Sequence, residues 1–254
     1  MTLHVRQLVK HFGGVQAVKG VSFDVNPGEC VALIGPNGAG KSTCFACIAG
    51  QHDLTQGEVR WAGQRIDRLP PARRQKLGVA RTFQVAQTFE ALTVIENLQL
   101  LLTAPRGLRA WNVLRTTAVD AAMALLAQVG LPHLAQTGTM DLPYGAKKRL
   151  ELAMALAGLP EDGSRLLLLD EPAAGLAGPE RAQLMTLVAS LARGGVAVLY
   201  TEHNMDAVFG VADRVLVLID GLLAAQGTPD EVARDDTVRS RYLGRSFRME
   251  AGHA

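Results

Sequence analysis

The sequence predicts an α/β protein built on parallel strands. Apolar runs such as 166–169 and 196–200 are typical of strands buried on both faces, and segments of helical spacing alternate with them. A glycine-rich loop follows another apolar run, 30–34, and leads into a helix expected over 43–49. No strand pattern occurs from about 85 to 160, so we expect that stretch to be an all-helical insert.

The chain before this insert is expected to be rich in strands. Alternating apolar residues predict three of them, at 3–8, 21–25 and 57–61. A short helix with proline in its first turn is expected over 70–76, followed by a strand over 79–83 that ends at Gln84.

The insert and the chain beyond it combine helices with a final hairpin. Helical spacing predicts five helices, at 93–102, 116–129, 145–156, 179–193 and 205–211. Apolar runs at 215–219 and 222–225 flank Asp220-Gly221, a pair that favours a hairpin turn. We interpret the tail from Arg239, which carries further arginines, as a solvated end.

Composition narrows the class of protein. A chain of 254 residues forms one or two domains, and a net charge of +2 is too small to indicate a nucleic-acid or anionic-membrane surface. The first residues have no apolar signal core, and no apolar run approaches the ~18 residues that a membrane-spanning helix needs. We therefore expect a protein that is soluble or held at a membrane by a partner.

Cysteine usage indicates a cytoplasmic compartment. Three cysteines, an odd number, argue against a disulfide framework. Cys44 and Cys47 form a C-x-x-C pair on the helix after the glycine-rich loop, but no second pair completes a zinc site. We interpret both as small core residues.

The glycine-rich loop has the pattern G-x-x-x-x-G-K-[ST], which binds phosphate in P-loop NTPases. The loop comprises Gly35, Pro36, Asn37, Gly38, Ala39, Gly40, Lys41, Ser42 and Thr43. Its glycines let backbone N–H groups curl around a polyphosphate, and the following helix points its N-terminus at the same charge. Lys41 is expected to reach the β- and γ-phosphates, and the Ser42 hydroxyl to bind Mg²⁺.

Two adjacent carboxylates end the apolar strand at 166–170. An acidic residue at the carboxyl end of a parallel strand points into the crevice where ligands bind, so Asp170 is predicted to hold Mg²⁺ directly or through water. Glu171 is placed to orient or deprotonate an attacking water. Repulsion between the two carboxylates favours a bound cation over the alternative, a helix cap before Pro172.

Three further side chains are candidates for the same site. His203, after the buried strand 196–200, is placed to hydrogen-bond a γ-phosphate or its water, with a structural role as the alternative. Gln84 is a candidate contact to Mg²⁺ or to the water. Phe12, before a double glycine, is a candidate platform on which a base stacks, the alternative being a core aromatic. We interpret the other histidines as structural.

Together these motifs closely resemble the ATP-binding-cassette (ABC) ATPases, over residues 3–244. The phosphate loop matches that family's Walker A motif, and 166–171 matches its Walker B motif with the catalytic glutamate. Phe12 matches the adenine-stacking aromatic, Gln84 the Q-loop and His203 the switch histidine. The resemblance implies ATP and Mg²⁺ as cofactors, and a RecA-like P-loop NTPase core with an antiparallel β subdomain and an inserted α-helical subdomain.

The same resemblance implies a division of the chain. Residues 1–84 and 160–244 are expected to form a discontinuous ATP-binding core, 85–159 a helical subdomain, and 245–254 a tail.

The most specific element of the resemblance stands where the family has its LSGGQ signature. It comprises Leu142, Pro143, Tyr144, Gly145 and Ala146. Kinases and GTPases lack this element. In the family two cassettes pack head to tail, and each ATP lies between the Walker motifs of one subunit and the signature of the other. The helix that begins near Gly145 would then point its N-terminus at the partner's γ-phosphate.

Several short stretches resemble the LivG-type ATPases of branched-chain amino-acid importers. They are 12–15, 81–84, 92–97, 143–145 and 201–205. The second ATPase of such systems usually carries Pro-Glu-Gly-Arg at 82–85, which favours the first subunit. Relatives that import urea, other amides or aromatic acids look similar, and an exporter ATPase, as in lipopolysaccharide transport, has the same architecture. A non-transport cassette ATPase is disfavoured because no coiled-coil heptads occur.

The resemblance also implies partners and a location. The expected partners are a second ABC ATPase subunit, identical or different, and transmembrane permeases, with a periplasmic substrate-binding protein acting indirectly and no nucleic acid. The chain would lie peripherally at the cytoplasmic face of the inner or plasma membrane, with permease docking at about 85–96.

At three positions the chain departs from the family. Pro143 replaces the signature serine, Ala146 replaces its glutamine, and Ala177 stands where the next loop usually has Asp or Asn. All three changes weaken what this subunit donates to its partner's nucleotide. We therefore expect a heterodimer in which the site containing Glu171 carries most of the turnover.

Overall fold

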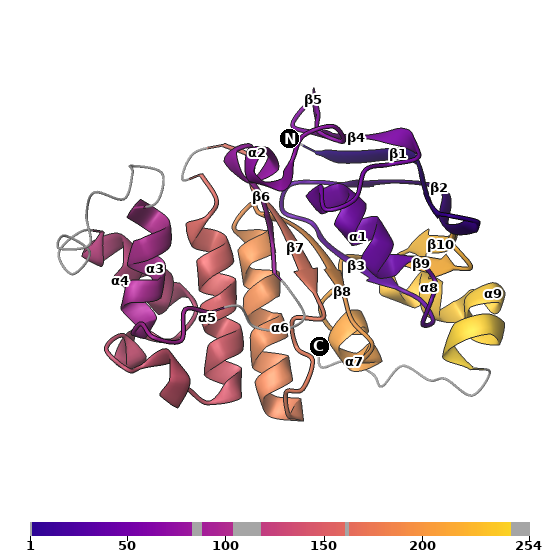
Figure 1. Cartoon of the computed structure of the whole chain (residues 1–254). Coiled ribbons are helices and arrows are strands. Elements are labelled where there is room, and N and C mark those ends of the chain that lie inside the picture. Colours follow the sequence, from indigo (N-terminus) through magenta and orange to yellow (C-terminus); the bar gives the residue numbers. More distant parts are fainter. Residues whose placement is uncertain (1, 83–87, 104–117, 161–162, 245–254) are drawn as a thin grey trace.

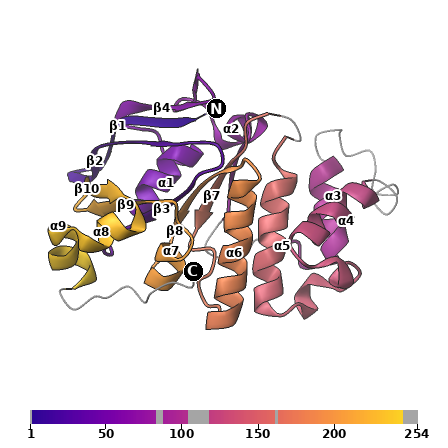
Figure 2. The same cartoon turned by 180° about the vertical axis from the view of Figure 1, so that it is seen from behind.

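The computed structural model describes residues 2–82, 88–103, 118–160 and 163–244. These residues form two sheets and a row of helices beside them (Figures 1 and 2). The α/β fold class predicted from the sequence is confirmed.

A four-stranded antiparallel sheet comes from the first part of the chain, in the spatial order β2-β1-β4-β5. Its strands are β1 (Leu3–Phe12), β2 (Val15–Val25), β4 (Gln56–Trp61) and β5 (Gln64–Arg65). β1 and β2 extend further than the alternation in the sequence predicts, because they pair almost to the tip of their hairpin, where Phe12 faces Val15.

A six-stranded sheet has the order β10-β9-β3-β8-β7-β6 and is parallel except for the β9-β10 hairpin. Its strands are β3 (Cys30–Ile34), β6 (Val79–Arg81), β7 (Leu166–Asp170), β8 (Ala197–Thr201), β9 (Arg214–Ile219) and β10 (Leu222–Gly227). The predicted turn at Asp220-Gly221 joins β9 and β10, with positive φ at both residues.

Alternate residues of the central strands enter two different cores, which explains why these strands are apolar throughout. Val31 and Leu33 of β3 pack with α1 (Lys41–Ala49) and the antiparallel sheet. Ala32 and Ile34 face the other way and join the core that contains α6 (Gly178–Arg193).

Three helices form a layer at the side of the molecule, beyond α6 (Figure 1). They are α3 (Val94–Thr103), α4 (Val119–Gln128) and α5 (Tyr144–Ala157). No strand occurs in the described part of 88–160. The β-type pairing there is limited to a single bridge between Thr93 and Gly138. The predicted helical character of this stretch is therefore confirmed for the residues that the structure describes.

Four short α-helices and three single helical turns complete the described chain. The α-helices are α2 (Pro71–Lys76), α7 (Met205–Phe209), α8 (Pro229–Arg234) and α9 (Asp236–Val238), and the helical turns are η2 (Pro132–Leu134), η3 (Thr139–Asp141) and η4 (Arg239–Leu243). α8 was not predicted, although Thr228 and Glu231 form a reciprocal capping box that is visible in the sequence. Among the described residues, no helix combines the length and apolar character needed to cross a membrane.

The interpretation of the cysteines as core residues is confirmed. Cys30, Cys44 and Cys47 are buried and unbridged. Burial raises the pKa of Cys47 to about 11 and that of Cys30 to about 12, and it raises the pKa of Cys44 further still. Thiols held in the protonated form are poor nucleophiles and poor metal ligands.

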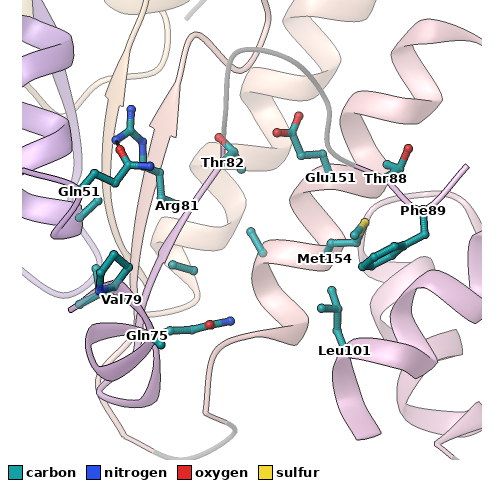
Figure 3. Close-up of a pocket in the computed structure, with 15 residues that line it drawn as sticks. Gln51, Gln75, Val79, Arg81, Thr82, Thr88, Phe89, Leu101, Glu151 and Met154 are labelled. Carbon is teal, nitrogen blue, oxygen red and sulfur yellow. Dashed lines mark hydrogen bonds between the residues drawn. The ribbon is translucent and has the colours of Figure 1, made fainter. Parts of the chain in front are cut away.

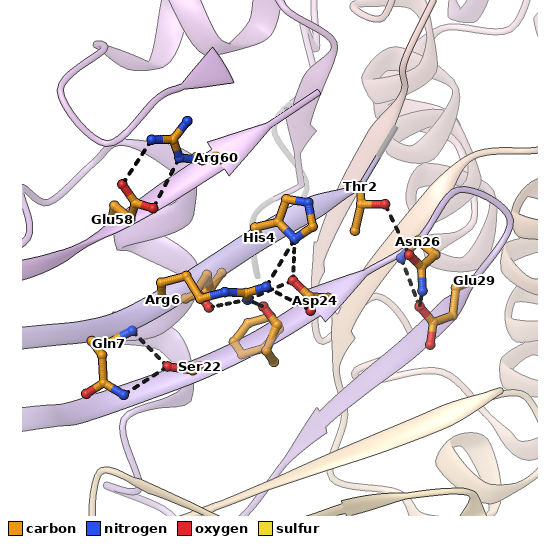
Figure 4. A network of polar contacts seen from close by, with 12 residues as sticks. Thr2, His4, Arg6, Gln7, Ser22, Asp24, Asn26, Glu29, Glu58 and Arg60 are labelled. Carbon is orange, nitrogen blue, oxygen red and sulfur yellow. Dashed lines mark hydrogen bonds and ion pairs between the residues drawn. The ribbon is translucent and has the colours of Figure 1, made fainter. Parts of the chain in front are cut away.

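A polar network covers the outer face of the antiparallel sheet (Figure 4). His4 Nδ1 lies 2.5 Å from Asp24 Oδ1, and Arg6 Nη1 lies 2.7 Å from the same oxygen. Both side chains of the His4–Asp24 pair are 39% exposed, so the pair lies at a solvated surface, where ion pairs contribute little to stability.

Candidate functional site

The carboxyl edge of the six-stranded sheet gathers the residues that the sequence singled out. The loop 35–40 leaves β3 at this edge, and the ends of β7 and β8 lie beside it, with Asp170 directly opposite Thr201. Loops at the carboxyl ends of parallel strands form the ligand-binding crevice of open α/β sheets.

Glycine is required in the loop for two different reasons. At Gly35, where φ is 147°, a Cβ would stand 2.0 Å from the carbonyl oxygen of Leu218, so no side chain fits. At Gly38, where φ is 79°, a Cβ would meet nothing within 4 Å. Backbone curvature demands glycine there, and the space beside the loop stays open for a ligand.

Lys41 begins α1 and is 7% exposed. Its Nζ donates to the carbonyl oxygens of Gly35 at 2.7 Å and Pro36 at 3.0 Å. Desolvation lowers the pKa of Lys41, while the nearby carboxylates of Glu171 and Asp170 act in the opposite direction. The phosphate loop thus holds a buried cation between its own carbonyls and the two carboxylates.

Asp170, at the end of β7, has a protein donor on each carboxylate oxygen. The Thr201 hydroxyl donates to Oδ1 at 2.8 Å, and Arg81 Nη2 donates to Oδ2 at 2.7 Å. Arg81 and Asp170 are 12% and 9% exposed in their side chains, so the ion pair is largely buried. Its partner Arg81 ends β6, the edge strand next to β7.

Glu171 has a strained backbone, with φ of 49°, a conformation that costs a non-glycine residue about 1–3 kcal/mol. Thr201 holds this conformation, since it accepts the Glu171 N–H through both its carbonyl oxygen (3.2 Å) and its hydroxyl (3.0 Å). The turn aims the Glu171 side chain at His203, whose Nε2 lies 2.9 Å from Oε1.

These contacts correct one step of the sequence argument. Asp170 is paired with Arg81, and Glu171 contacts His203, so each carboxylate has its own partner within the protein. Repulsion between them is therefore no evidence for a bound cation. The metal-binding role of Asp170 stays a prediction that depends on the position of the carboxylate beside the phosphate loop.

Phe12 lies at the outer end of β1 and is 44% exposed, so its interpretation as a core aromatic is wrong. The His52 ring packs edge-on against it at 5.2 Å between centroids, and Lys10 Nζ lies 4.9 Å from the ring centre. Further along the same hairpin, Val18 and Ala17 contact the phosphate loop at Gly40. Phe12 thus offers an exposed aromatic ring on the strand pair that touches the loop.

The sequence gives Gln84 a role in the site, but Gln84 lies outside the described residues. The last described residue before it, Thr82, is buried beside β7 and donates its N–H to Leu168.

The stretch expected to be the signature begins α5. Pro143 is the N-cap of α5 and forms no side-chain cap, Leu142 is buried, and Ala146 lies in the first turn. The Tyr144 hydroxyl donates to the carbonyl oxygen of Ala174 at 3.3 Å. A Cβ at Gly145 would lie 3.1 Å from a carboxylate oxygen of Glu180.

Besides Thr201, two residues of the site had no role in the sequence analysis. Glu202 is 4% exposed and accepts the N–H groups of Ala173 (2.9 Å) and His203 (3.2 Å), and so joins the loop after Glu171 to the loop after β8. Arg81 is the second. Both are charged residues at or just after the end of a buried strand, β6 for Arg81 and β8 for Glu202, and this position in the sequence could have marked them as site residues.

Comparison with known proteins agrees with this geometry. A family model described as ABC transporter matches residues 18–174. The high-affinity branched-chain amino acid transport ATP-binding protein LivG of Escherichia coli (strain K12) is 38% identical over 256 aligned residues, which cover 95% of this chain and 97% of LivG. The corresponding protein BraF of Pseudomonas aeruginosa is 37% identical, with coverage of 95% and 97%.

Solved structures give the same result. The ADP conformation of an ATP-binding cassette of an ABC transporter has a TM-score of 0.82 and 31% identity, and covers 96% of this chain and 99% of its own. A nucleotide-free cassette from an ABC transporter has the same TM-score with 30% identity and covers 96% and 100%. On the sequence match and the shared fold, this chain belongs to the ABC transporter family, as an ATP-hydrolysing ATP-binding cassette.

Proposed function

We propose that this cassette energises an importer of branched-chain or related amino acids. The observation that carries the proposal is the identity with LivG and BraF over nearly the whole chain, since both proteins are named for branched-chain amino-acid transport. Other subunits of such a transporter bind the cargo. The identity of the cargo is therefore proposed from these relatives alone, whereas ATP hydrolysis is a property of the cassette itself.

In this proposal the phosphate loop binds the polyphosphate of ATP. The N–H groups of 35–43 and the N-terminus of α1 supply partial positive charge. Lys41 would exchange its contacts with the Gly35 and Pro36 carbonyls for contacts to phosphate oxygens. Phe12 would stack on adenine through its exposed face.

The residues available at the site suit a Mg²⁺ ion whose ligands are mainly phosphate oxygens and water. Among the described residues no group of three or more His, Cys, Asp and Glu side chains is suited to hold a metal by itself. A hydroxyl at Ser42 and one carboxylate at Asp170 are the few protein ligands that Mg²⁺ takes in nucleotide sites. We assign Ser42 and Asp170 to the metal, together with Gln84. Bound there, the ion would neutralise charge on the phosphates.

Glu171 is the proposed general base. Its carboxylate would accept a proton from the water whose oxygen bonds to the γ-phosphorus as the bond to the leaving ADP oxygen breaks. The contact with His203 Nε2 would orient the carboxylate, and the buried Glu202 joins the loops that carry Glu171 and His203. The signature 142–146 would act on the partner subunit's nucleotide.

A groove between the sheet and the helical layer is the proposed docking site for a permease (Figure 3). Its volume is about 620 Å³, and it is lined by β6 and α2 on one side and by α3 and α5 on the other. Phe89, which is 46% exposed, and Thr88 contribute from the segment expected to contact the permease. The groove would hold the chain peripherally at the cytoplasmic face of the membrane. We also propose that the chain divides into a core and a helical subdomain at about residues 85 and 160, with this groove between them.

Titration of the Lys41 variant with Mg·ATP tests the nucleotide site. Lys41→Ala should weaken Mg·ATP binding by about 1.5–3 kcal/mol, since a charge-assisted contact to phosphate is lost, and titration calorimetry reads the change. Unchanged affinity would contradict the proposed site.

Purification of the chain from its native membranes tests the transport role. We expect it to bring down permeases, and leucine should accelerate ATP hydrolysis by the complex reconstituted with its binding protein. Acceleration by urea, an aromatic acid or a lipid in place of leucine would reassign the cargo. Pelleting with membranes in high salt when no permease is expressed would contradict partner-dependent attachment.

A further inference from the structure

Arg81 connects Asp170 of the proposed metal site with Gln51, which lies just beyond α1. It ends β6, and its guanidinium reaches the Asp170 carboxylate at 2.7 Å through Nη2. Nη1 donates to the side-chain oxygen of Gln51, just beyond α1. Figure 3 shows the side chains of Arg81 and Gln51 together at one side of the groove. Arg81 is therefore held in place from two sides.

The position of this cation has an electrostatic consequence for Asp170. The carboxylate is 9% exposed, and a buried charge requires a counter-charge close by. Arg81 supplies one that is fixed, always protonated and already bonded to Oδ2. The other oxygen, Oδ1, accepts the Thr201 hydroxyl. A divalent cation that approaches Asp170 therefore meets a carboxylate whose charge is already compensated.

We propose that Arg81 competes with Mg²⁺ for the Asp170 carboxylate. Arg81 would thereby set the Mg²⁺ concentration at which the nucleotide site binds Mg²⁺ together with ATP. The inference rests on the proposed Mg·ATP site. The metal gains less from Asp170 because it must weaken the Arg81–Asp170 ion pair or bind beside a second positive charge. Without metal, the same ion pair supplies the direct counter-charge of a carboxylate that is largely buried.

The alternative is that Arg81 only orients Asp170 for the metal. The two possibilities predict opposite signs when the charge is removed. If Arg81 competes, a neutral side chain lowers the Mg²⁺ concentration required; if it only orients the carboxylate, a neutral side chain raises it.

The experiment titrates Mg²⁺ into the full-length protein with a fixed amount of a non-hydrolysable ATP analogue, followed by calorimetry, and also measures melting temperature in EDTA. In Arg81→Met we expect the Mg²⁺ midpoint to fall about tenfold, equivalent to about 1.4 kcal/mol. The melting temperature without metal should fall, because Asp170 loses its counter-charge. Arg81→Lys keeps the charge and should stay near the wild-type midpoint.

Arg60→Met is the matched control, because Arg60 pairs with Glu58 on the solvated face of β4. Its midpoint should equal that of the wild type. Should Arg81→Met fail to fold, Arg81→Gln retains an N–H donor to Asp170 without the charge and carries the same expectation. A midpoint that is unchanged or raised in the folded neutral variant would overturn the inference. Failure of the wild-type protein to bind the analogue with Mg²⁺ would instead overturn the proposed function.

Discussion

The Nε2 atom of His203 lies 2.9 Å from Oε1 of Glu171, although the two residues follow different strands. The strained backbone of Glu171 aims its side chain at the imidazole, and the carboxylate is 19% exposed. A carboxylate that lies beside an imidazole nitrogen and is still partly exposed is suited to accept a proton from a bound water.

Glu171→Gln is expected to bind ATP yet hydrolyse it about 10²–10⁴-fold more slowly, because the amide keeps the shape but cannot accept the proton of the water. Phosphate release measures the rate, and gel filtration should show an ATP-bound dimer that accumulates. Glu58→Gln, on the solvated sheet face, is the control and should keep the wild-type rate. Turnover in Glu171→Gln at the wild-type rate would refute the role given to this carboxylate.

Arg74 stabilises the end of α1 that is opposite the phosphate loop. It is 1% exposed and donates to the carbonyl oxygens of Cys47 (2.7 Å) and Ile48 (2.6 Å), where the helix dipole is negative. Two further bonds reach the carbonyl oxygens of Asp67 and Leu69. One cation thus serves four backbone acceptors.

Arg74→Met is expected to lower the free energy of unfolding by at least about 3 kcal/mol, since several buried carbonyls lose their donor. Urea unfolding measures the change. The neighbouring Arg73 is exposed, so Arg73→Met should stay within about 0.5 kcal/mol of the wild type. Equal stabilities of the two variants would show that the four bonds contribute little.

Asp67 makes part of the stability dependent on pH. Burial acts to raise the pKa of Asp67, but hydrogen bonds from Arg65 and from the Val59 N–H together outweigh it, so the pKa is lowered. A lowered folded-state pKa means that the contribution is complete above the unfolded pKa of about 3.9 and is lost as pH falls through the folded value.

Asp67→Asn should therefore cost about 1–2 kcal/mol of unfolding free energy at pH 7, because a hydrogen bond to a charged acceptor is replaced by a weaker one. The difference from the wild type should shrink as pH falls below about 4. Urea unfolding at a series of pH values measures it, with the exposed Asp230→Asn as control. A difference that stays constant down to pH 3 would contradict the assignment.

How far the sequence predicts the molecule depends on the range of the interactions involved. β3 and β7 have the bounds predicted from their apolar runs. Every residue of such a strand is buried, so the first and last buried positions mark its ends in the sequence. The capping box of α8 is equally local, so this helix is predictable from the sequence.

The site was predictable to the extent that motifs encode it. The meeting of Glu171 with His203 follows from two strand ends at one sheet edge. The Arg81–Asp170 pair and the bond from Glu202 to Ala173 depend on strand order and side-chain reach, which no local pattern contains.

At the positions expected to be the signature and the next loop, the chain lacks the polar side chains that the family resemblance would direct across a cassette dimer. Pro143 caps α5 without a side-chain hydrogen bond, and Ala177 caps α6 without one. The Tyr144 hydroxyl is directed to Ala174 of its own chain, and the Glu180 carboxylate lies beside Gly145 at the start of α5. A negative charge there opposes the attraction of the helix N-terminus for phosphate.

We therefore predict a heterodimer with unequal sites. Loss of one hydroxyl bond to a charged oxygen costs about 1.5–3 kcal/mol, or roughly ten- to a hundredfold in rate. The partner's nucleotide, served by the signature of this chain, should turn over slowly, while the site that contains Glu171 uses the partner's signature. In the reconstituted complex, Glu171→Gln should lower ATP hydrolysis more than the matching replacement in the partner does. Equal losses, or full ATPase and transport activity from a homodimer of this chain, would rule out unequal sites, because a homodimer has only the signature with Pro143 and Ala146 to offer both nucleotides.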